Sequence, residues 1–309
     1  MAEITIPQIK YLPGRPRTTK IIKRGSSLPP FISFIPYESK VFSFMIHGFS
    51  TRLGGVSEGI FESLNFASGR GDEPDNILEN FKRMGVSLGD IPADDMVYAK
   101  QTHTANVLHV TGRHRGMGVT RERDFDDIDA LVTDTPNVCL VAGFADCIPI
   151  FFADPVKKAI GLAHSGWRGT IADIAGATIR KMKEDFGSSP KDITAYIGPG
   201  ICREHYEVSK DVADEFIRVY SEKEKNDPFP AKGSLNVVTP IPDSNDKYLL
   251  DLHHACFLNL IDSGVPAENI HLTDICTCCN PDLLFSHRFT ARKRGGLCGF
   301  MMKKDLIDH

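Results

Sequence analysis

Residues 144–169 read Phe144-Ala-Asp-Cys147-Ile-Pro-Ile-Phe-Phe-Ala-Asp-Pro-Val-Lys-Lys-Ala-Ile-Gly-Leu-Ala-His164-Ser-Gly-Trp-Arg-Gly169. Two apolar runs flank a turn at residues 154–157, which has proline at its second position and predicts a β-hairpin. If the turn is centred on its two middle residues, Cys147 and His164 face each other at the open end of the hairpin. Directly opposed side chains have Cβ atoms roughly 4.5–5.5 Å apart. The stretch therefore predicts a thiol beside an imidazole, as in a metal site or a Cys–His catalytic pair.

His103 is the candidate for a third ligand. It stands in Lys100-Gln-Thr-His103-Thr, between two predicted strands, where a histidine can point into a cleft. Together with Cys147 and His164 it would give a His2Cys set with a fourth position open, as catalytic zinc prefers. Spacing does not by itself join His103 to the pair, because a single histidine is more often a surface or satisfied core residue.

Two glycine-containing turns are candidate anion sites. After His164 the chain runs Ser-Gly-Trp-Arg168-Gly into a helix expected from Thr170, and the free N–H groups of a helix N-terminus suit an anion. The alternative is a plain tight turn in which Arg168 forms a structural ion pair. The second turn lies in His47-Gly-Phe-Ser-Thr-Arg52-Leu-Gly-Gly-Val-Ser57, where Arg52 could clamp a phosphate. The alternative is that the glycines only supply positive φ in a turn.

Cys276-Thr-Cys278-Cys279 has the appearance of half a metal-binding knuckle. No CxxC partner stands at the spacing of a zinc finger, and Cys202 and Cys298 are isolated in the sequence. We therefore expect a reduced structural cluster near a turn rather than a second zinc site.

Composition is that of an ordinary globular protein, with 309 residues, 41% hydrophobic and 25% charged. The net charge of -4 gives no electrostatic case for binding nucleic acid or an anionic membrane. No apolar run reaches the roughly 18–20 residues that span a bilayer, and the N-terminus lacks the layout of a signal peptide. We expect a cytoplasmic protein, in which the eight cysteines stay mostly reduced.

Residues 1–30 form a basic, proline-rich arm, expected to be a solvated tail or an extended edge segment rather than a binding tail. Residues 31–309 show no linker or repeat and are predicted to form one domain, of mixed α/β (α+β) class, with β-sheets flanked by helices. Apolar periodicity predicts helices at 76–88, 170–186, 211–220 and 250–263. It predicts strands at 43–49, 96–98, 105–110, 130–133, 138–144, 148–153, 158–163 and 193–197.

Over roughly residues 40–303 the chain resembles the laccase-domain family of YfiH-like proteins, also called polyphenol oxidases or peptidoglycan-editing factors. The matching segments are residues 47–57, Ser63-Leu-Asn65, Gln101-Thr-His103, Asp129-Ala-Leu-Val-Thr-Asp134, Ala145-Asp-Cys147-Ile-Pro, residues 163–169, Ile197-Gly-Pro-Gly-Ile201, Tyr206-Glu-Val208, Asp251-Leu and Ser286-His-Arg288. The resemblance implies one α/β domain and a zinc ion held by His103, Cys147 and His164. It also implies an enzyme that acts on purine nucleosides. The implied reactions are phosphorolysis of adenosine, inosine or methylthioadenosine, and deamination of adenosine.

Two positions depart from the family pattern. Ser165 stands where alanine is usual, beside a predicted ligand, and Lys293-Arg-Gly-Gly-Leu297 replaces the usual Thr-Gly-Arg run. No role is therefore assigned from the sequence to Arg292 or Arg294.

Around the predicted zinc we expect Asp146 to act as a proton acceptor or to orient an imidazole. Arg52 is the predicted clamp for phosphate and a catalytic group, while Asn65 and Arg168 are predicted to contact ribose or phosphate. The partners would then be a small nucleoside and phosphate.

Two other functions remain open. One is an amidase or hydrolase that edits peptidoglycan precursors, with Cys147 as nucleophile and His164 as base. The other is a copper-dependent polyphenol oxidase. This chain has none of the His-X-His pairs of a trinuclear copper cluster, although Cu²⁺ could still occupy the His2Cys set.

Overall fold

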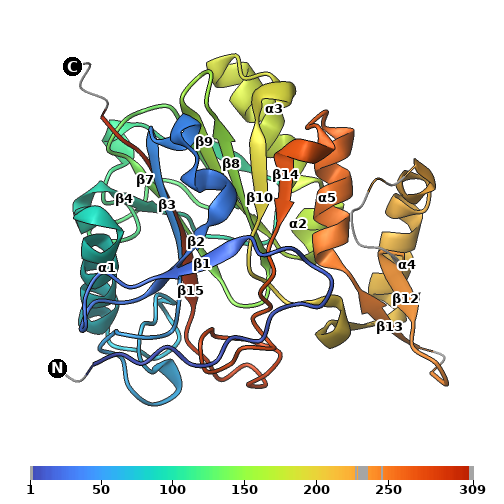
Figure 1. Cartoon of the computed structure of the whole chain (residues 1–309), viewed down its shortest axis with the longest axis horizontal. Coiled ribbons are helices and arrows are strands. Elements are labelled where there is room, and N and C mark those ends of the chain that lie inside the picture. Colours follow the sequence, from blue (N-terminus) through green and yellow to red (C-terminus); the bar gives the residue numbers. More distant parts are fainter. Residues whose placement is uncertain (1–2, 227, 229–235, 245, 306–309) are drawn as a thin grey trace.

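A computed structural model describes residues 3–226, 228, 236–244 and 246–305. Two six-stranded sheets lie face to face, and helices cover their outer faces (Figure 1). The arrangement is a single mixed α/β domain, as the sequence predicts.

The first sheet has the order β1-β2-β3-β15-β7-β4. Its neighbours run antiparallel, except for the parallel pair β4 and β7. The last strand of the chain thus enters the sheet between two earlier ones. The strands are β1 (Thr19–Ile22), β2 (Phe31–Phe34), β3 (Met45–Ser50), β15 (Leu297–Lys303), β7 (Cys139–Phe144) and β4 (Met96–Tyr98).

The second sheet has the order β14-β10-β8-β9-β6-β5, with the predicted hairpin at its centre. Its edge strands β14 and β5 pair in parallel with their neighbours. The strands are β14 (Ile270–Leu272), β10 (Thr194–Ile197), β8 (Ile148–Asp154), β9 (Ala159–Ser165), β6 (Ala130–Thr133) and β5 (Val107–His109).

Every residue of β8 and β9 is buried, because both faces of this sheet are covered. Side chains alternate along β8, so that Phe152 packs toward the helices and Phe151 packs between the sheets. The outer layers are α3 (Ile174–Phe186) and α5 (Leu252–Asp262) on this sheet and α1 (Pro74–Gly89) on the first.

A small third sheet, β11-β13-β12, stands beside α5 with α4 (Lys210–Tyr220) packed on it (Figure 1). Its strands are β11 (Glu207–Ser209), β13 (Lys247–Leu250) and β12 (Val238–Pro240). The predicted helices at 76–88, 211–220 and 250–263 and all eight predicted strands are present within a few residues. The strands that sequence patterns missed are short or lie near the termini, namely β1, β2, β11, β12, β13, β14 and β15.

The helix predicted over 170–186 is two helices, α2 (Trp167–Ile171) and α3. Asp173 adopts a left-handed conformation (φ 59°) between them, and its carboxylate accepts a hydrogen bond from Gly176 N at 3.0 Å. Asp173 is therefore the N-cap of a new helix, and the prediction of one continuous helix over 170–186 is wrong at this residue.

The register of the central hairpin also differs from the prediction. His164 pairs with Pro149, and Cys147 lies just beyond the last pair of the ladder. The loop has four residues, 155–158, because the Asp154 carboxylate accepts hydrogen bonds from the backbone of Val156 and Lys157. The register moves by two positions, and since side chains alternate with a period of two, His164 keeps its predicted face.

Candidate metal centre and active site

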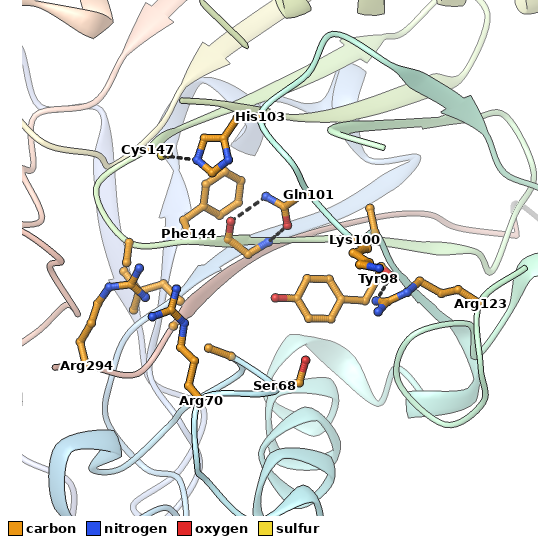
Figure 2. Close-up of a pocket in the computed structure, with 16 residues that line it drawn as sticks. Ser68, Arg70, Tyr98, Lys100, Gln101, His103, Arg123, Phe144, Cys147 and Arg294 are labelled. Atoms are coloured by element: carbon orange, nitrogen blue, oxygen red, sulfur yellow. Dashed lines mark hydrogen bonds between the residues drawn. The ribbon is translucent and has the colours of Figure 1, made fainter. Parts of the chain in front are cut away.

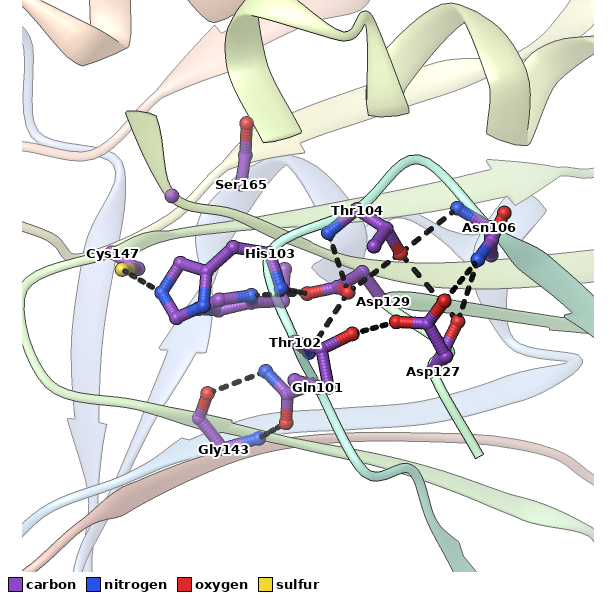
Figure 3. A network of polar contacts seen from close by, with 12 residues as sticks. Gln101, Thr102, His103, Thr104, Asn106, Asp127, Asp129, Gly143, Cys147 and Ser165 are labelled. Carbon is purple, nitrogen blue, oxygen red and sulfur yellow. Dashed lines mark hydrogen bonds and ion pairs between the residues drawn. The ribbon is translucent and has the colours of Figure 1, made fainter. Parts of the chain in front are cut away.

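The three predicted ligands converge at one end of the hairpin. The donor atoms of His103, Cys147 and His164 all lie within 4.8 Å of one another. Cys147 Sγ is 3.9 Å from His103 Nε2, and Figure 3 shows the His103 ring directed at the thiol. His103 comes from the loop after β4, Cys147 from the β7–β8 connection and His164 from β9. The fold thus places His103 beside Cys147 and His164, which sequence spacing alone does not establish.

A carboxylate that the sequence reasoning did not single out holds two of these segments. Asp129, which is fully buried, lies 2.8 Å from His164 Nδ1. It also accepts hydrogen bonds from the backbone N–H groups of Thr102, His103 and Thr104 (Figure 3). These bonds hold His103 in its left-handed conformation (φ 70°). Asp129 therefore orients the imidazole of His164 directly and positions the backbone of His103.

The charges in the trio favour a thiolate. Burial raises the pKa of the Cys147 thiol, but the positive charge of His164 and the hydrogen bond from His103 outweigh burial and bring this pKa to about 6. Burial lowers the pKa of His164, whereas Cys147 and Asp129 raise it, to about 9. Burial also raises the pKa of Asp129, but the hydrogen bond from His164 and the backbone donors bring it to about 2.

This donor set fits a divalent metal. One thiolate and two imidazoles are ligands that zinc and copper both accept. Since Asp129 engages His164 Nδ1, the Nε2 atom of that ring is free to face the other two donors. Three protein ligands leave room for a further one, as a catalytic site requires.

The trio lies where two pockets meet. His103 and Cys147 line both of them, together with Ala145, Arg70 and Arg294. One pocket continues along Tyr98, Lys100 and Arg123 (Figure 2). The other is lined by Tyr206, Leu252 and His287. Because they share this wall, we describe them as one cleft with a polar arm and a more apolar arm, and the third ligand, His164, is buried behind the shared wall and lines neither arm.

Two arginines make the cleft electropositive. Figure 2 shows the guanidinium groups of Arg70 and Arg294 on the side of the pocket below His103 and Cys147. Arg294 Nε is buried without a hydrogen-bond partner, and burial together with the charge of Arg70 lowers the pKa of Arg294 to about 10. A buried cationic donor with a spare N–H suits an anionic ligand. The sequence assigned no role to Arg294, because residues 293–297 depart from the family pattern.

Asp146 lies in the cleft but does not touch the imidazoles. Its carboxylate accepts hydrogen bonds from Thr277 Oγ1 at 2.6 Å and from Arg288 N at 2.7 Å. It therefore fixes the loop that carries His287 and Arg288. The orienting role predicted for Asp146 belongs to Asp129 instead.

Arg52 is not brought to the cleft. Its guanidinium donates to the carbonyl oxygens of Glu62 and Pro281 and lies over the ring of Phe285. Neither pocket described above includes Arg52. The position of Arg52 beside paired glycines did not distinguish the two roles, because a guanidinium binds backbone carbonyls as well as phosphate.

Asn65 and Arg168 are likewise absent from the walls of the two pockets. Asn65 is fully buried, binds the Asp72 carboxylate, and accepts hydrogen bonds from Ala67 N and Gly296 N. It therefore supports two segments of the pocket wall from behind. Arg168 is exposed and lies over the ring of Trp167.

The family model described as "Multi-copper polyphenol oxidoreductase laccase" matches residues 46–304, and the chain belongs to this family. It is 35% identical over 262 residues to purine nucleoside phosphorylase YlmD of Bacillus subtilis, covering 84% of this chain and 89% of that protein. It is 32% identical over 271 residues to a purine nucleoside phosphorylase of Bacteroides thetaiotaomicron, covering 87% and 96%.

Solved structures show the same fold. YfiH of Bacillus licheniformis superposes with a TM-score of 0.80 at 32% identity, covering 92% of this chain and 99% of that one. YlmD of Geobacillus stearothermophilus gives a TM-score of 0.79 at 31% identity, covering 94% and 100%. In the part of the chain that the structure describes, no helix is long and apolar enough to cross a membrane.

Proposed function

We propose that this protein is a zinc-dependent purine nucleoside phosphorylase that acts on adenosine, inosine or methylthioadenosine. The observation that carries the proposal is the position of His103 and Cys147, with His164 beside them, on the wall of a cleft that also presents Arg70 and Arg294. Relatives named purine nucleoside phosphorylase support the reaction class.

In phosphorolysis, a phosphate oxygen forms a bond to C1′ of the ribose while the bond from C1′ to N9 of the purine breaks. The electron pair of that bond leaves with the purine, which takes up a proton. Arg70 and Arg294 would hold the phosphate and offset its charge, so that it approaches C1′ in a fixed orientation.

The trio would hold the metal, with Asp129 fixing the direction of the His164 imidazole and the position of the His103 backbone. Zinc, when bound, supplies positive charge and Lewis acidity in the centre of the cleft. Tyr206 and Leu252 offer an apolar wall on which a purine ring can lie. Asp146 would act by holding the loop of His287 and Arg288 against the same arm of the cleft.

The direct test is a product screen of zinc-loaded protein on adenosine, inosine and methylthioadenosine, with and without phosphate. We expect free base and ribose 1-phosphate only when phosphate is present, and loss of turnover in His103→Ala. Inosine formed from adenosine without phosphate would show deamination, the second activity that the family resemblance implies. Turnover that persists in metal-free protein would reject the zinc-dependent proposal.

A second candidate is a cysteine hydrolase or amidase that acts through Cys147 and His164. The lowered pKa of Cys147 and the raised pKa of His164, which describe a thiolate–imidazolium pair in the protein without metal, favour it. Amide hydrolysis by chelator-treated protein, abolished in Cys147→Ser, would support this candidate over the phosphorylase.

A copper oxidase has less support. Within the described residues, two groups of three or more side chains have ligand atoms close enough for one ion, and neither is the histidine-rich set of a trinuclear copper cluster. An oxidase activity would require Cu²⁺ bound by the His2Cys set.

A further inference from the structure

A second group of metal-ligating side chains forms away from the cleft. Cys202, His205, Cys276 and Cys279 come from two segments more than 70 positions apart in the sequence, and their donor atoms lie within 4.8 Å of one another. Each segment contributes its pair with two residues between, as Cys-x-x-His and Cys-x-x-Cys. This spacing is typical of structural zinc sites. The Cys276 segment has no second CxxC pair at zinc-finger spacing in the sequence, and in the structure the Cys202–His205 pair takes that place.

The distances among Cys202, His205 and Cys279 are close to the edges of a tetrahedron around zinc, and Cys276 Sγ lies within 4.8 Å of all three donor atoms. Bond lengths of about 2.3 Å to sulfur and about 2.0 Å to nitrogen place tetrahedral ligands about 3.8 Å apart for two sulfurs and about 3.5 Å apart for sulfur and nitrogen. Cys202 Sγ and Cys279 Sγ are 3.9 Å apart. His205 Nδ1 lies 3.1 Å from Cys202 Sγ and 3.5 Å from Cys279 Sγ.

The surroundings suit a closed metal site. Cys202 and Cys276 are buried, beside Ile201 and Leu12, while His205 closes the group from the solvent side. The backbone N–H of Cys202 donates to Cys276 Sγ at 3.2 Å, a contact that stabilises a thiolate. All three cysteines are free, and a sulfur separation of 3.9 Å is far beyond the roughly 2.05 Å of a disulfide bond.

The group ties together the ends of two neighbouring strands. Gly200, just after β10, forms a bridge with Cys276, just after β14, and Thr277 N donates to Gly200 O at 3.0 Å. The same two segments reach the cleft, because Ile201 N donates to Asp146 O and Thr277 Oγ1 donates to the Asp146 carboxylate. An ion here would clamp the connection that precedes Cys147.

We propose that Cys202, His205, Cys276 and Cys279 bind a second metal ion, of the zinc class, in a structural site separate from the catalytic trio. On binding, the three thiols release their protons, and four protein ligands leave no position for a substrate. The ion links distant segments, so it stabilises the folded chain rather than taking part in the reaction. The inference does not depend on the proposed phosphorylase activity.

The test counts metal in the full-length protein, purified under reducing conditions and reconstituted with zinc. We expect two equivalents of zinc in the wild type and one in Cys147→Ala. In the Cys147→Ala background, Cys279→Ser and His205→Ala should remove the remaining equivalent. Both positions are at least partly accessible, which limits damage to the core, and circular dichroism checks the fold. Cys278→Ser is the matched control, because this neighbouring thiol is outside the group and its loss should leave one equivalent.

A second measurement does not rely on zinc counting. Co²⁺ in the Cys147→Ala protein should give thiolate-to-metal absorption that His205→Ala weakens and Cys278→Ser leaves unchanged. Chelation should lower the melting temperature of Cys147→Ala but not that of the double variant Cys147→Ala/Cys279→Ser. A folded, reduced Cys147→Ala protein that binds no zinc or cobalt would overturn the proposal, as would a Cys202–Cys279 disulfide in protein purified with reductant.

Discussion

Asp129 Oδ1 lies 2.8 Å from His164 Nδ1, and the same carboxylate binds the backbone on both sides of His103. One buried side chain therefore orients one candidate metal ligand, His164, and positions the backbone that carries another, His103. Loss of such a supporting carboxylate typically costs roughly 10–100-fold in metal affinity or activity.

Asp129→Asn should accordingly weaken zinc binding by roughly 10–100-fold, because a neutral amide holds the imidazole less firmly. Competition with a chromophoric chelator measures the change. Asp127→Asn is the matched control, since Asp127 is an exposed acid that binds Thr102 and Asn106 but does not contact His164. Equal losses in both variants would mean that the loop, and not the His164 contact, controls affinity.

Cys147 should react as a thiolate at unusually low pH once metal is removed. With its pKa lowered to about 6, the reactive form predominates above pH 6, whereas an ordinary cysteine needs about pH 8.5. Iodoacetamide labelling of chelator-treated protein, followed by peptide mass spectrometry, gives the profile. Zinc should suppress labelling across the whole range. A midpoint near 8.5 would contradict the thiolate–imidazolium pair.

Arg294→Gln should raise KM for phosphate roughly 10–100-fold, which corresponds to the loss of about 1.5–3 kcal/mol in charged hydrogen bonds. Steady-state kinetics at varied phosphate measures it. Arg292→Gln is the control, because Arg292 is exposed and lines neither pocket at the trio. A similar rise in both variants would indicate general electrostatic attraction rather than a binding contact.

Arg52→Gln separates the two roles considered for Arg52. The guanidinium joins the carbonyls of Glu62 and Pro281, so its loss should lower the free energy of unfolding by about 2 kcal/mol. Urea denaturation measures the change. We expect KM for phosphate to stay within a factor of two, and a large rise without loss of stability would restore the phosphate-clamp prediction.

Stability should fall as the pH drops from about 6.5 to 4. His253 is fully buried, and burial, together with the charge of Arg15, lowers its pKa to about 4. The folded state therefore binds fewer protons than the unfolded state, in which histidine titrates near 6.5, and it loses up to about 3 kcal/mol across this window. Urea midpoints at pH 7.5, 6 and 5 measure the slope. His253→Gln should flatten it, and an unchanged slope would assign the effect to other groups.

Local patterns along the chain predicted the β8–β9 hairpin, most of the helices, the central strands of the second sheet, and β3, β7 and β4 of the first sheet, but not β15 between β3 and β7. These elements are set by side-chain periodicity and turn chemistry, which are properties of neighbouring residues. The hairpin pattern paired Cys147 with His164, His103 was the candidate third ligand, the family resemblance implied the same three residues, and the structure brings them together. The hairpin register was off by two because the Asp154 side chain lengthens the loop, and sequence spacing does not reveal that contact.

Only the tertiary structure decided which distant segments meet. The order of strands in each sheet is not their order in the chain, so β15 enters between β3 and β7 and brings Arg294 to the cleft. The pairing of β10 with β14 likewise joins Cys202, which is isolated in the sequence, and His205 to Cys276 and Cys279. Residues determine local conformation through their own sterics and hydrogen bonding. Long-range neighbours follow from how the buried faces of whole elements stack, and a single sequence carries no direct record of that arrangement.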